Sequence, residues 1–357
     1  MPNVFDYISW RGDLSFKQSN FNEIDNMIMS RLSYLPFEKI KLQEKETIKT
    51  IAKKLKDVKE EYFNMPNDKN LIKEIEKSIR FKDLEITDYC AIRDFNEQKQ
   101  FVAITIHLND EEIYLSYGGT DNTLVGWKED FNLSFMTHIP SQIEGLKYIK
   151  KISKEYTQKM HLGGHSKGGN IAVYSAVFCP KKIQSRIIDI TNHDGPGFDK
   201  TIIETEGYKR ILNKIYTYIP QSSVIGRLLE HEEKYKIVKS VQKGIMQHDI
   251  YSWQLLGTKF IKSNEITNGS NMINETVRNW LKSTTPEQRK NFINVMYEVV
   301  TTTKAKTFKD FTASFAKNIG IILKTYKNID EKDKKMIGQM IFTFIGAAKD
   351  SIKEKII

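Results

Sequence analysis

Short apolar runs alternate with amphipathic segments through the middle of the chain. Stretches rich in β-branched and aromatic residues predict strands at 84–93, 101–107, 113–117, 186–192, 214–219 and 235–241, and one more short strand ends near Gly163. Residues 141–159, a segment that opens at Ser166, and residues 199–212 have helical character. After an antiparallel lead-in, strands that alternate with helices predict a mostly parallel sheet covered on both faces, which is an α/β fold.

The two ends of the chain have different patterns. Residues 1–40 carry apolar and aromatic side chains without one clean period, so we expect them to wrap around the domain that follows. Residues 43–81 are rich in Lys and Glu, and a break at 65–68 divides them into two expected helices. Helical patterns fill the end of the chain, at 272–281, 286–302, 308–326 and 331–355.

These patterns predict two parts. An α/β domain covers residues 1–269 and includes a helical insertion at about 43–81, and a helical extension covers residues 270–357. We expect the two helical parts to form a cap or lid over a site in the α/β domain. The chain has 357 residues, of which 39% are hydrophobic, so it is long enough to bury a substantial core.

The net charge of +10 is concentrated near the C-terminus, where residues 261–357 hold 17 Lys and Arg against 10 Asp and Glu. No basic block with interleaved aromatic residues stands out, so we expect no nucleic-acid partner. One interpretation places the basic helices at 308–357 on an anionic membrane surface as a peripheral contact. The alternative is an ordinary packed subdomain with a solvated Lys-rich surface.

The sequence also bears on the compartment and on cofactors. Cys90 and Cys179 lack metal-ligand spacing and are typical of buried thiols in a reducing compartment. The first residues lack the pattern of a signal peptide, and the longest apolar stretch, 336–348, is too short to span a membrane. We therefore expect a cytoplasmic protein that needs no metal or organic cofactor.

The strongest local signal is a G-x-S-x-G pentapeptide at residues 164–168. In this motif a serine occupies a tight turn from strand to helix, and small residues two positions away avoid a clash. The helix that opens at Ser166 favours developing negative charge through its N-terminal amides. The motif therefore predicts that Ser166 is a nucleophile. A glycine-rich turn without chemistry is the alternative.

A nucleophilic serine needs a base, which is most often a histidine. In this topology the chain order is serine, acid, histidine, so His193, His231 and His248 qualify. His248 lies in a loop directly after the last predicted strand and is the preferred base. His231 lies in a run of charged residues that is typical of a solvated helix.

The acid should follow a strand between the nucleophile and the histidine. Asp194 ends a predicted strand and precedes Gly195-Pro196-Gly197, a sharp turn that presents the carboxylate at the C-terminal edge of the sheet, where ligands bind. Asp249 adjoins the histidine and would point away from it, and Asp189 lies in the middle of its strand. Asp194 is therefore the preferred acid, and a turn-forming Asp before Gly-Pro is the alternative.

An oxyanion hole needs two N–H groups aimed at the carbonyl oxygen of the substrate. Lys167 follows the nucleophile and is expected to supply one of them. Gly118 and Gly119 end an earlier strand and let the backbone approach a ligand, so Thr120 is expected to supply the second N–H and its hydroxyl. A plain glycine turn is the alternative for this segment.

Together these residues resemble a known family. The segment 117–121, Tyr-Gly-Gly-Thr-Asp, with Trp127 and Asp130-Phe131 after it, is similar to the F-R-G-T…W…D pattern of class 3 (fungal-type) lipases, and residues 164–170 are similar to their G-H-S-L-G-G-A elbow. The segments 6–13 and 247–253 more closely resemble the Mbeg-like proteins, a bacterial branch of the α/β-hydrolases. The resemblance covers about residues 1–257.

The resemblance implies an α/β-hydrolase fold with Thr120 in the oxyanion hole, Ser166 as nucleophile and His248 as base. It also implies a serine ester hydrolase that cleaves an acyl or lipid ester through an acyl-serine intermediate.

Two positions depart from the lipase pattern. Where those lipases carry the acid of the triad, this chain has Gln221-Ser222-Ser223, which is a further reason to look to Asp194. Where those lipases carry an apolar residue after the nucleophile, this chain has Lys167. Its positive charge either favours an anionic substrate or stabilises an oxyanion; the alternative is that the side chain points to solvent. The missing acid supports a second hypothesis, a catalytically silent binding or scaffold protein with the same fold.

Overall fold

The computed structural model describes residues 2–121, 123–301, 324, 331 and 334–339. The chain divides into two compact units. The first unit comprises Met1–Ile92, Phe101–Gly119 and Ser141–Thr267, and the second comprises Arg93–Gln100, Thr120–Pro140 and Asn268–Ile357. Two short segments from inside the expected α/β domain, 93–100 and 120–140, thus group with the C-terminal part of the chain.

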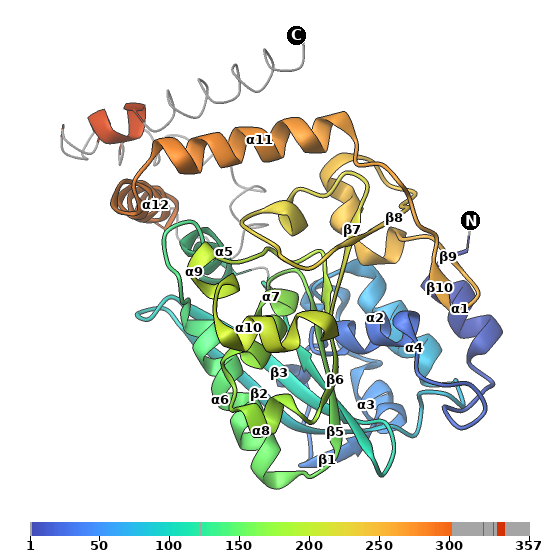
Figure 1. Ribbon diagram of the computed structural model, residues 1–357. Coiled ribbons are helices and arrows are strands. Elements are labelled where there is room, and N and C mark those ends of the chain that lie inside the picture. Colours follow the sequence, from blue (N-terminus) through green and yellow to red (C-terminus); the bar gives the residue numbers. More distant parts are fainter. Residues whose placement is uncertain (1, 122, 302–323, 325–330, 332–333, 340–357) are drawn as a thin grey trace. The chain divides into compact units, whose positions relative to one another are not determined.

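Most of a single large sheet lies in the first unit (Figure 1). In the described part of the chain it has eight strands, which lie side by side in chain order: β1 (Lys45–Thr47), β2 (Glu85–Asp94), β3 (Lys99–His107), β4 (Glu112–Tyr117), β5 (Lys159–His165), β6 (Ile187–His193), β7 (Ile215–Pro220) and β8 (Lys236–Val238). β1 pairs with β2 and β3 pairs with β4 in antiparallel fashion, whereas β4 to β8 pair in parallel. The predicted lead-in and mostly parallel sheet are confirmed.

The register of the parallel strands brings their carboxyl ends to one edge of the sheet. Tyr117 at the end of β4 pairs with Gly164 on β5, His165 on β5 pairs with His193 on β6, and His193 pairs with Tyr218 on β7. The residues that follow β5 and β6 are therefore neighbours in space, although they are far apart in the sequence.

Side chains on the strands alternate between two cores, one on each face of the sheet. On β3, Ile104 and Ile106 point to one core and Ala103 points to the other. On β4, Tyr114 points to the first core and Leu115 to the second. This alternation is the period of two that a strand imposes on its side chains. Both faces are apolar, so both must be covered by helices.

Two layers of helices cover the two faces (Figure 1). The first layer contains α1 (Val4–Arg11), α2 (Glu23–Leu32), α3 (Ile48–Leu55) and α4 (Pro66–Ile75). The second contains α6 (Pro140–Glu155), α7 (Lys167–Phe178), α8 (Lys181–Gln184), α9 (Lys200–Ile203) and α10 (Glu206–Ile211). A mostly parallel sheet between two helical layers is an α/β-hydrolase-type fold, as predicted.

The N-terminal helices differ from what the sequence pattern predicted. Residues 1–40 contain α1 and α2, and each begins with a capping box in which an Asn and the Asp three residues later bond each other's backbone amides: Asn3 with Asp6, and Asn22 with Asp25. Residues 43–81 do form two helices, but β1 precedes them as an edge strand of the sheet, and the apolar faces of α3 and α4 lie in the core.

Apart from residues 93–94 and 99–100, which belong to β2 and β3, the regular structure in the described part of the second unit is helical. It contains α5 (Leu124–Asn132), α11 (Asn268–Ser283) and α12 (Pro286–Thr301), and α5 packs against α12. Lys128 of α5 is buried and donates to Asn132 and to Asn294 of α12, at 3.1 and 2.6 Å. The helices expected at 272–281 and 286–302 are confirmed. Those expected at 308–326 and 331–355 lie outside the described residues, apart from 324, 331 and 334–339.

None of the helices in these described ranges combines the length and the apolarity that crossing a membrane requires.

A buried ion pair ties the N-terminal segment to the start of the sheet. Arg80 Nη2 lies 2.5 Å from Asp25 Oδ2, and neither side chain is exposed. The same guanidinium donates to the carbonyl oxygens of Leu14, Ser19 and Asn20 at 2.9 to 3.1 Å. Arg80 therefore joins α2 and the loop before it to the segment that leads into β2.

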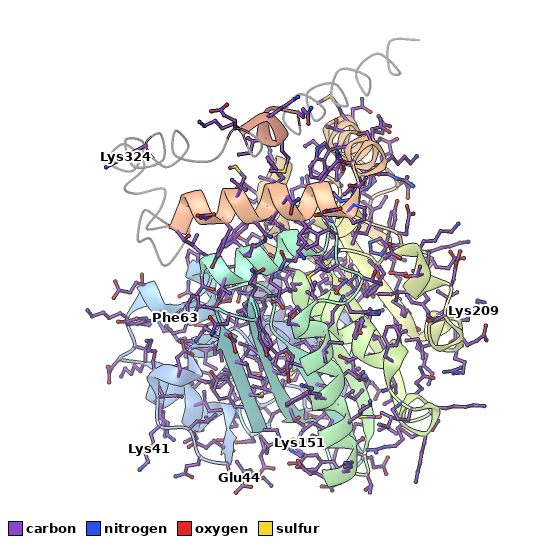
Figure 2. All side chains as sticks on the ribbon, turned by 90° about the vertical axis from the view of Figure 1, so that its left-hand side faces the viewer. Lys41, Glu44, Phe63, Lys151, Lys209 and Lys324 are labelled. Carbon is purple, nitrogen blue, oxygen red and sulfur yellow. The ribbon has the colours of Figure 1, made fainter. Side chains whose placement is uncertain are left out.

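We expect Arg80→Leu to lower the free energy of unfolding by about 3–5 kcal/mol, because it leaves Asp25 buried without its partner. Urea denaturation followed by circular dichroism measures the change. The control is Lys209→Met, which removes an exposed ion pair with Glu206 on α10, where Lys209 projects from the surface (Figure 2); this change should stay within about 0.5 kcal/mol. Equal effects of the two substitutions would contradict the importance of the buried pair.

Candidate active site

Ser166 occupies a sharp turn between β5 and α7. Its backbone has φ 58° and ψ −135°, a conformation that costs a residue other than glycine about 1–3 kcal/mol. The backbone N–H of Ser166 donates to the carbonyl of His193 at 2.9 Å, which holds the turn against the end of β6. This is the strand-to-helix turn that the pentapeptide predicts.

The two glycines of the pentapeptide are required by close backbone contacts. A Cβ atom at Gly164 would lie 2.3 Å from the carbonyl carbon of Gly168, and one at Gly168 would lie 2.1 Å from the carbonyl oxygen of Tyr117. These distances leave no room for a side chain, so β4, β5 and α7 approach one another only because both positions are glycine.

A second strained turn follows β6. Asp194 has φ 53°, and the adjacent Gly195 is bracketed by Asn192, whose side chain accepts from the Gly195 N–H at 2.8 Å and donates to its carbonyl at 3.1 Å. Asn170 of α7 donates to the carbonyl oxygens of residues 196 and 197. The turn that the Gly-Pro-Gly sequence predicted is therefore fixed by two buried amide side chains.

The Asp194 carboxylate is buried and meets three donors. Its Oδ1 accepts from the Ser223 hydroxyl at 2.5 Å and from the Gly226 N–H at 3.2 Å, and its Oδ2 lies 2.7 Å from Nδ1 of His248. The structure thus brings together the acid and the base that the sequence analysis preferred. Ser223, in the segment where the lipase pattern has its acid, donates to Asp194 instead, and this contact has no signal in the sequence.

The contact with Asp194 fixes the proton on the His248 ring. A carboxylate only accepts, so Nδ1 of His248 carries a hydrogen, and in the neutral ring Nε2 then carries the lone pair that a general base requires. Between the described residues, no hydrogen bond joins the Ser166 hydroxyl to the His248 ring. In enzymes without bound substrate, catalytic hydrogen bonds are often long or poorly aligned and tighten only when substrate binds.

The loop that carries His248 consists of two short 3-10 helices, Gly244–His248 and Ile250–Ser252. Gln247 fixes its first half: its side-chain oxygen accepts from the Ser222 N–H at 2.7 Å, its amide donates to the carbonyl of Gln242, and its own carbonyl accepts from the Trp253 indole at 2.8 Å. The residues that flank His248 in the segment 247–253 therefore hold the loop in place.

The other two histidines downstream of Ser166 have different surroundings. Burial lowers the pKa of His193 to about 3, so this ring is neutral at physiological pH. His231 was expected on a solvated helix, but its side chain is buried and its Nδ1 lies 3.0 Å from Glu233. The expectation was wrong because residues 231–234 form no helix, and the side chains of His231 and Glu233 turn inward between exposed neighbours. Glu233 is buried and accepts from Tyr208 and Thr217.

The two predicted oxyanion residues lie in different units. Lys167 is the first residue of α7, where backbone N–H groups point out of the helix, and it is only 1% exposed, so its side chain does not point to solvent. Thr120 belongs to the second unit, and its hydroxyl donates to Asp130 at 2.5 Å. A Cβ atom on Gly119, the residue before it, would lie 2.6 Å from the carbonyl oxygen of His165. The oxyanion role of Thr120 stays a prediction.

Among the described residues, no group of three or more His, Cys, Asp and Glu side chains is placed to hold a metal ion.

Comparisons with known proteins identify one family. The family model described as Mbeg1-like matches residues 75–298, more than half of the chain and a range that includes Ser166, Asp194 and His248. No curated protein matches the sequence.

Several solved lipase structures have a similar fold. A Rhizomucor miehei lipase in complex with its propeptide has 15% identity and a TM-score of 0.33, with 44% of this chain and 57% of that chain covered. The M37 lipase has 16% identity and a TM-score of 0.37, with 57% and 69% covered. A fungal lipase–inhibitor complex has 10% identity and a TM-score of 0.39, with 60% and 79% covered. The chain thus spans little more than half the length of the first of these.

The close contacts of the elbow predict a large cost for one added methyl group. We expect Gly168→Ala to lower the free energy of unfolding by roughly 1–3 kcal/mol, because its Cβ would meet the backbone of β4. The matched control is Gly269→Ala in α11, where a Cβ meets no atom within 4 Å, and which should be neutral or stabilising by up to about 1 kcal/mol. Thermal denaturation of both variants checks this, and an unaffected Gly168→Ala would refute the packing.

Proposed function

This chain belongs to the Mbeg1-like family, and from that premise and the geometry of its site we propose that it is a serine ester hydrolase. The observation that carries the proposal is the buried Asp194 carboxylate 2.7 Å from Nδ1 of His248, beside a serine held in a strained turn at the start of a helix. In the proposed reaction an acyl or lipid ester is cleaved through an acyl-serine intermediate.

Each step of the proposed reaction has a candidate group. The Ser166 oxygen attacks the ester carbonyl while Nε2 of His248 takes its proton, and Asp194 orients the ring and stabilises its positive charge. The backbone N–H of Lys167, and in our proposal that of Thr120, stabilise the oxyanion. The tetrahedral intermediate then collapses, the alcohol leaves with the proton from His248, and water hydrolyses the acyl-serine with His248 as base.

The scaffold alternative depended on the missing carboxylate at Gln221-Ser222-Ser223. Asp194 at the end of the previous strand supplies a carboxylate to His248, and Ser223 donates to it. This contact supports a hydrolase over a silent protein with the same fold, because it supplies the carboxylate whose absence was the main support for the scaffold alternative.

The class of substrate is part of the proposal. Ile245 and Met246 lie in the 3-10 helix that ends at His248, and each is 61% exposed, which suits an apolar acyl group near the base. A lid formed by the C-terminal helices, a peripheral membrane contact of the basic segment 308–357 and a cytoplasmic location remain proposals. Of the segment 308–357, only residues 324, 331 and 334–339 lie within the described ranges.

We expect Ser166→Ala to abolish hydrolysis of p-nitrophenyl butyrate, with kcat reduced by roughly 10⁵- to 10⁶-fold, because no other group supplies the nucleophile. Spectrophotometric release of p-nitrophenolate measures the rate. The control is Ser175→Ala on the same helix, where a buried hydroxyl donates to the carbonyl of Ile171; it should keep activity within about 3-fold. Substantial turnover by Ser166→Ala would exclude this serine as the nucleophile.

The acid is tested by a variant that keeps its shape. Asp194→Asn tolerates the positive φ and still accepts from Ser223, but its amide presents a donor to the His248 ring and favours the wrong tautomer. We expect kcat for the same ester to fall by roughly 10³- to 10⁴-fold with a folded protein. An equal loss in Asp249→Asn, or no loss in Asp194→Asn, would assign the acid elsewhere.

A further inference from the structure

The histidine inside the elbow, His165, has both ring nitrogens engaged. The residue is 1% exposed, its Nδ1 lies 3.3 Å from Nη1 of Arg31, and its Nε2 lies 2.9 Å from the backbone carbonyl oxygen of His248. Its ring also lies against the ring of His248, with 4.6 Å between the ring centroids and 34° between the planes. The His165 side chain therefore contacts both the backbone and the side chain of His248, the proposed base.

The chemistry of its partners fixes the state of His165. A guanidinium only donates, so Nδ1 must accept, and a carbonyl oxygen only accepts, so Nε2 must carry the hydrogen. This assigns the neutral ring with the proton on Nε2. Burial, followed by the nearby His248 and Arg31, lowers the pKa of His165 well below its usual value, in agreement with that state. A ring used in this way at both nitrogens has no lone pair left for the serine.

Arg31 is itself held rigidly. Its Nε and Nη2 donate to the Asp68 carboxylate at 2.7 to 3.1 Å, and both side chains are 1% exposed. The guanidinium carbon also lies 3.8 Å from the centre of the Tyr34 ring, and the Tyr34 hydroxyl donates to the carbonyl of His165. α2 and α4 thus present a fixed donor to His165.

The network closes on the loop that carries the base. The Tyr251 hydroxyl donates to Oδ1 of Asp68 at 2.6 Å, three residues after His248. Asp68 therefore holds the loop at Tyr251 directly, and holds it at His248 through Arg31 and His165. His248 ends the 3-10 helix Gly244–His248, and Tyr251 lies in the next one, Ile250–Ser252, so each of the two short helices has one attachment point.

We propose that His165 is a positioning residue, which holds His248 in place for proton transfer with Arg31 and Asp68 as its support. The effect of His165 on catalysis rests on the proposed function. Its role in holding the loop that carries His248 does not. Arg31 and Asp68 both precede residue 75, where the match to the family model begins, so this support is contributed by a part of the chain outside that match.

Two substitutions of His165 separate positioning from packing. His165→Phe keeps a ring of similar size and removes both polar contacts, whereas His165→Gln keeps one donor and one acceptor. For p-nitrophenyl butyrate we expect His165→Phe to lower kcat by roughly 10- to 100-fold with KM within about 2-fold, because a misplaced base affects the chemical step. His165→Gln should stay within about 3-fold of the wild type.

A control on the same strand measures the general effect of losing a buried histidine. His161 of β5 is buried and lies 2.8 Å from Asp189, outside the proposed site. His161→Phe should leave kcat within about 3-fold. If His165→Phe and His161→Phe lower kcat equally, or if His165→Gln is as impaired as His165→Phe, the positioning role is wrong.

A second measurement does not need activity. Hydrogen exchange of the amides at 244–253 should speed up by at least roughly 10-fold in His165→Phe, and much less in His165→Gln and His161→Phe. If the wild-type protein does not hydrolyse esters, the proposed function fails, while exchange still decides whether His165 orders the loop. Unchanged exchange in His165→Phe would overturn the inference.

The wild-type protein offers a test in case the variants do not fold. Nitrogen NMR of ¹⁵N-histidine-labelled protein should show His165 as a neutral ring with its proton on Nε2. A proton on Nδ1, or a charged ring at neutral pH, is incompatible with the two contacts and would also overturn the inference.

Discussion

Positive φ angles at the ends of two neighbouring strands place the parts of this site. Ser166 after β5 has φ 58° and Asp194 after β6 has φ 53°, and the Ser166 N–H donates to the residue that precedes Asp194. Residues other than glycine adopt this conformation at a cost, so the surroundings must hold them there. Here the surroundings are the glycines at 164 and 168 and the amide side chains of Asn170 and Asn192.

The same constraint places Asp194, the proposed acid, one strand earlier than the acid of the lipase pattern. The turn after β6 points the Asp194 carboxylate toward the segment that follows β7, where the Ser223 hydroxyl and the Gly226 N–H donate to it. A Cβ at Gly226 would lie 2.3 Å from Oδ1 of Asp194, so this position must also stay small. The carboxylate of Asp194 thus follows β6, and two of its hydrogen-bond donors follow β7.

Local chemistry made part of this arrangement predictable from sequence. The pentapeptide at 164–168 predicted the strained turn, the Gly-Pro-Gly after Asp194 predicted the second, and the alternating strands and helices predicted the sheet. The role of Ser223 was not predictable, because a serine after a strand has no distinctive pattern. Arg31 and Asp68 were missed for a different reason: their contact with His165 joins residues 31, 68 and 165, and no local periodicity encodes such distances.

The N-terminal helices are part of the α/β unit and do more than wrap around it. Residues 1–40 have no single period because their two helices are short and separately capped. Two buried ion pairs, Asp25–Arg80 and Arg31–Asp68, bind α2 to the rest of the unit. An uncompensated charge in either pair would be costly, so these segments are integral to the α/β unit. This helical layer therefore supports the proposed base as well as covering the sheet.

The central claim is that Ser166 becomes covalently attached to the substrate. Incubation with a fluorophosphonate, followed by protease digestion and mass spectrometry, locates any adduct on the chain. The account predicts one adduct on the peptide that contains Ser166, formed much more slowly in His248→Ala. A folded protein that forms no adduct, or forms it on another residue, would contradict the account.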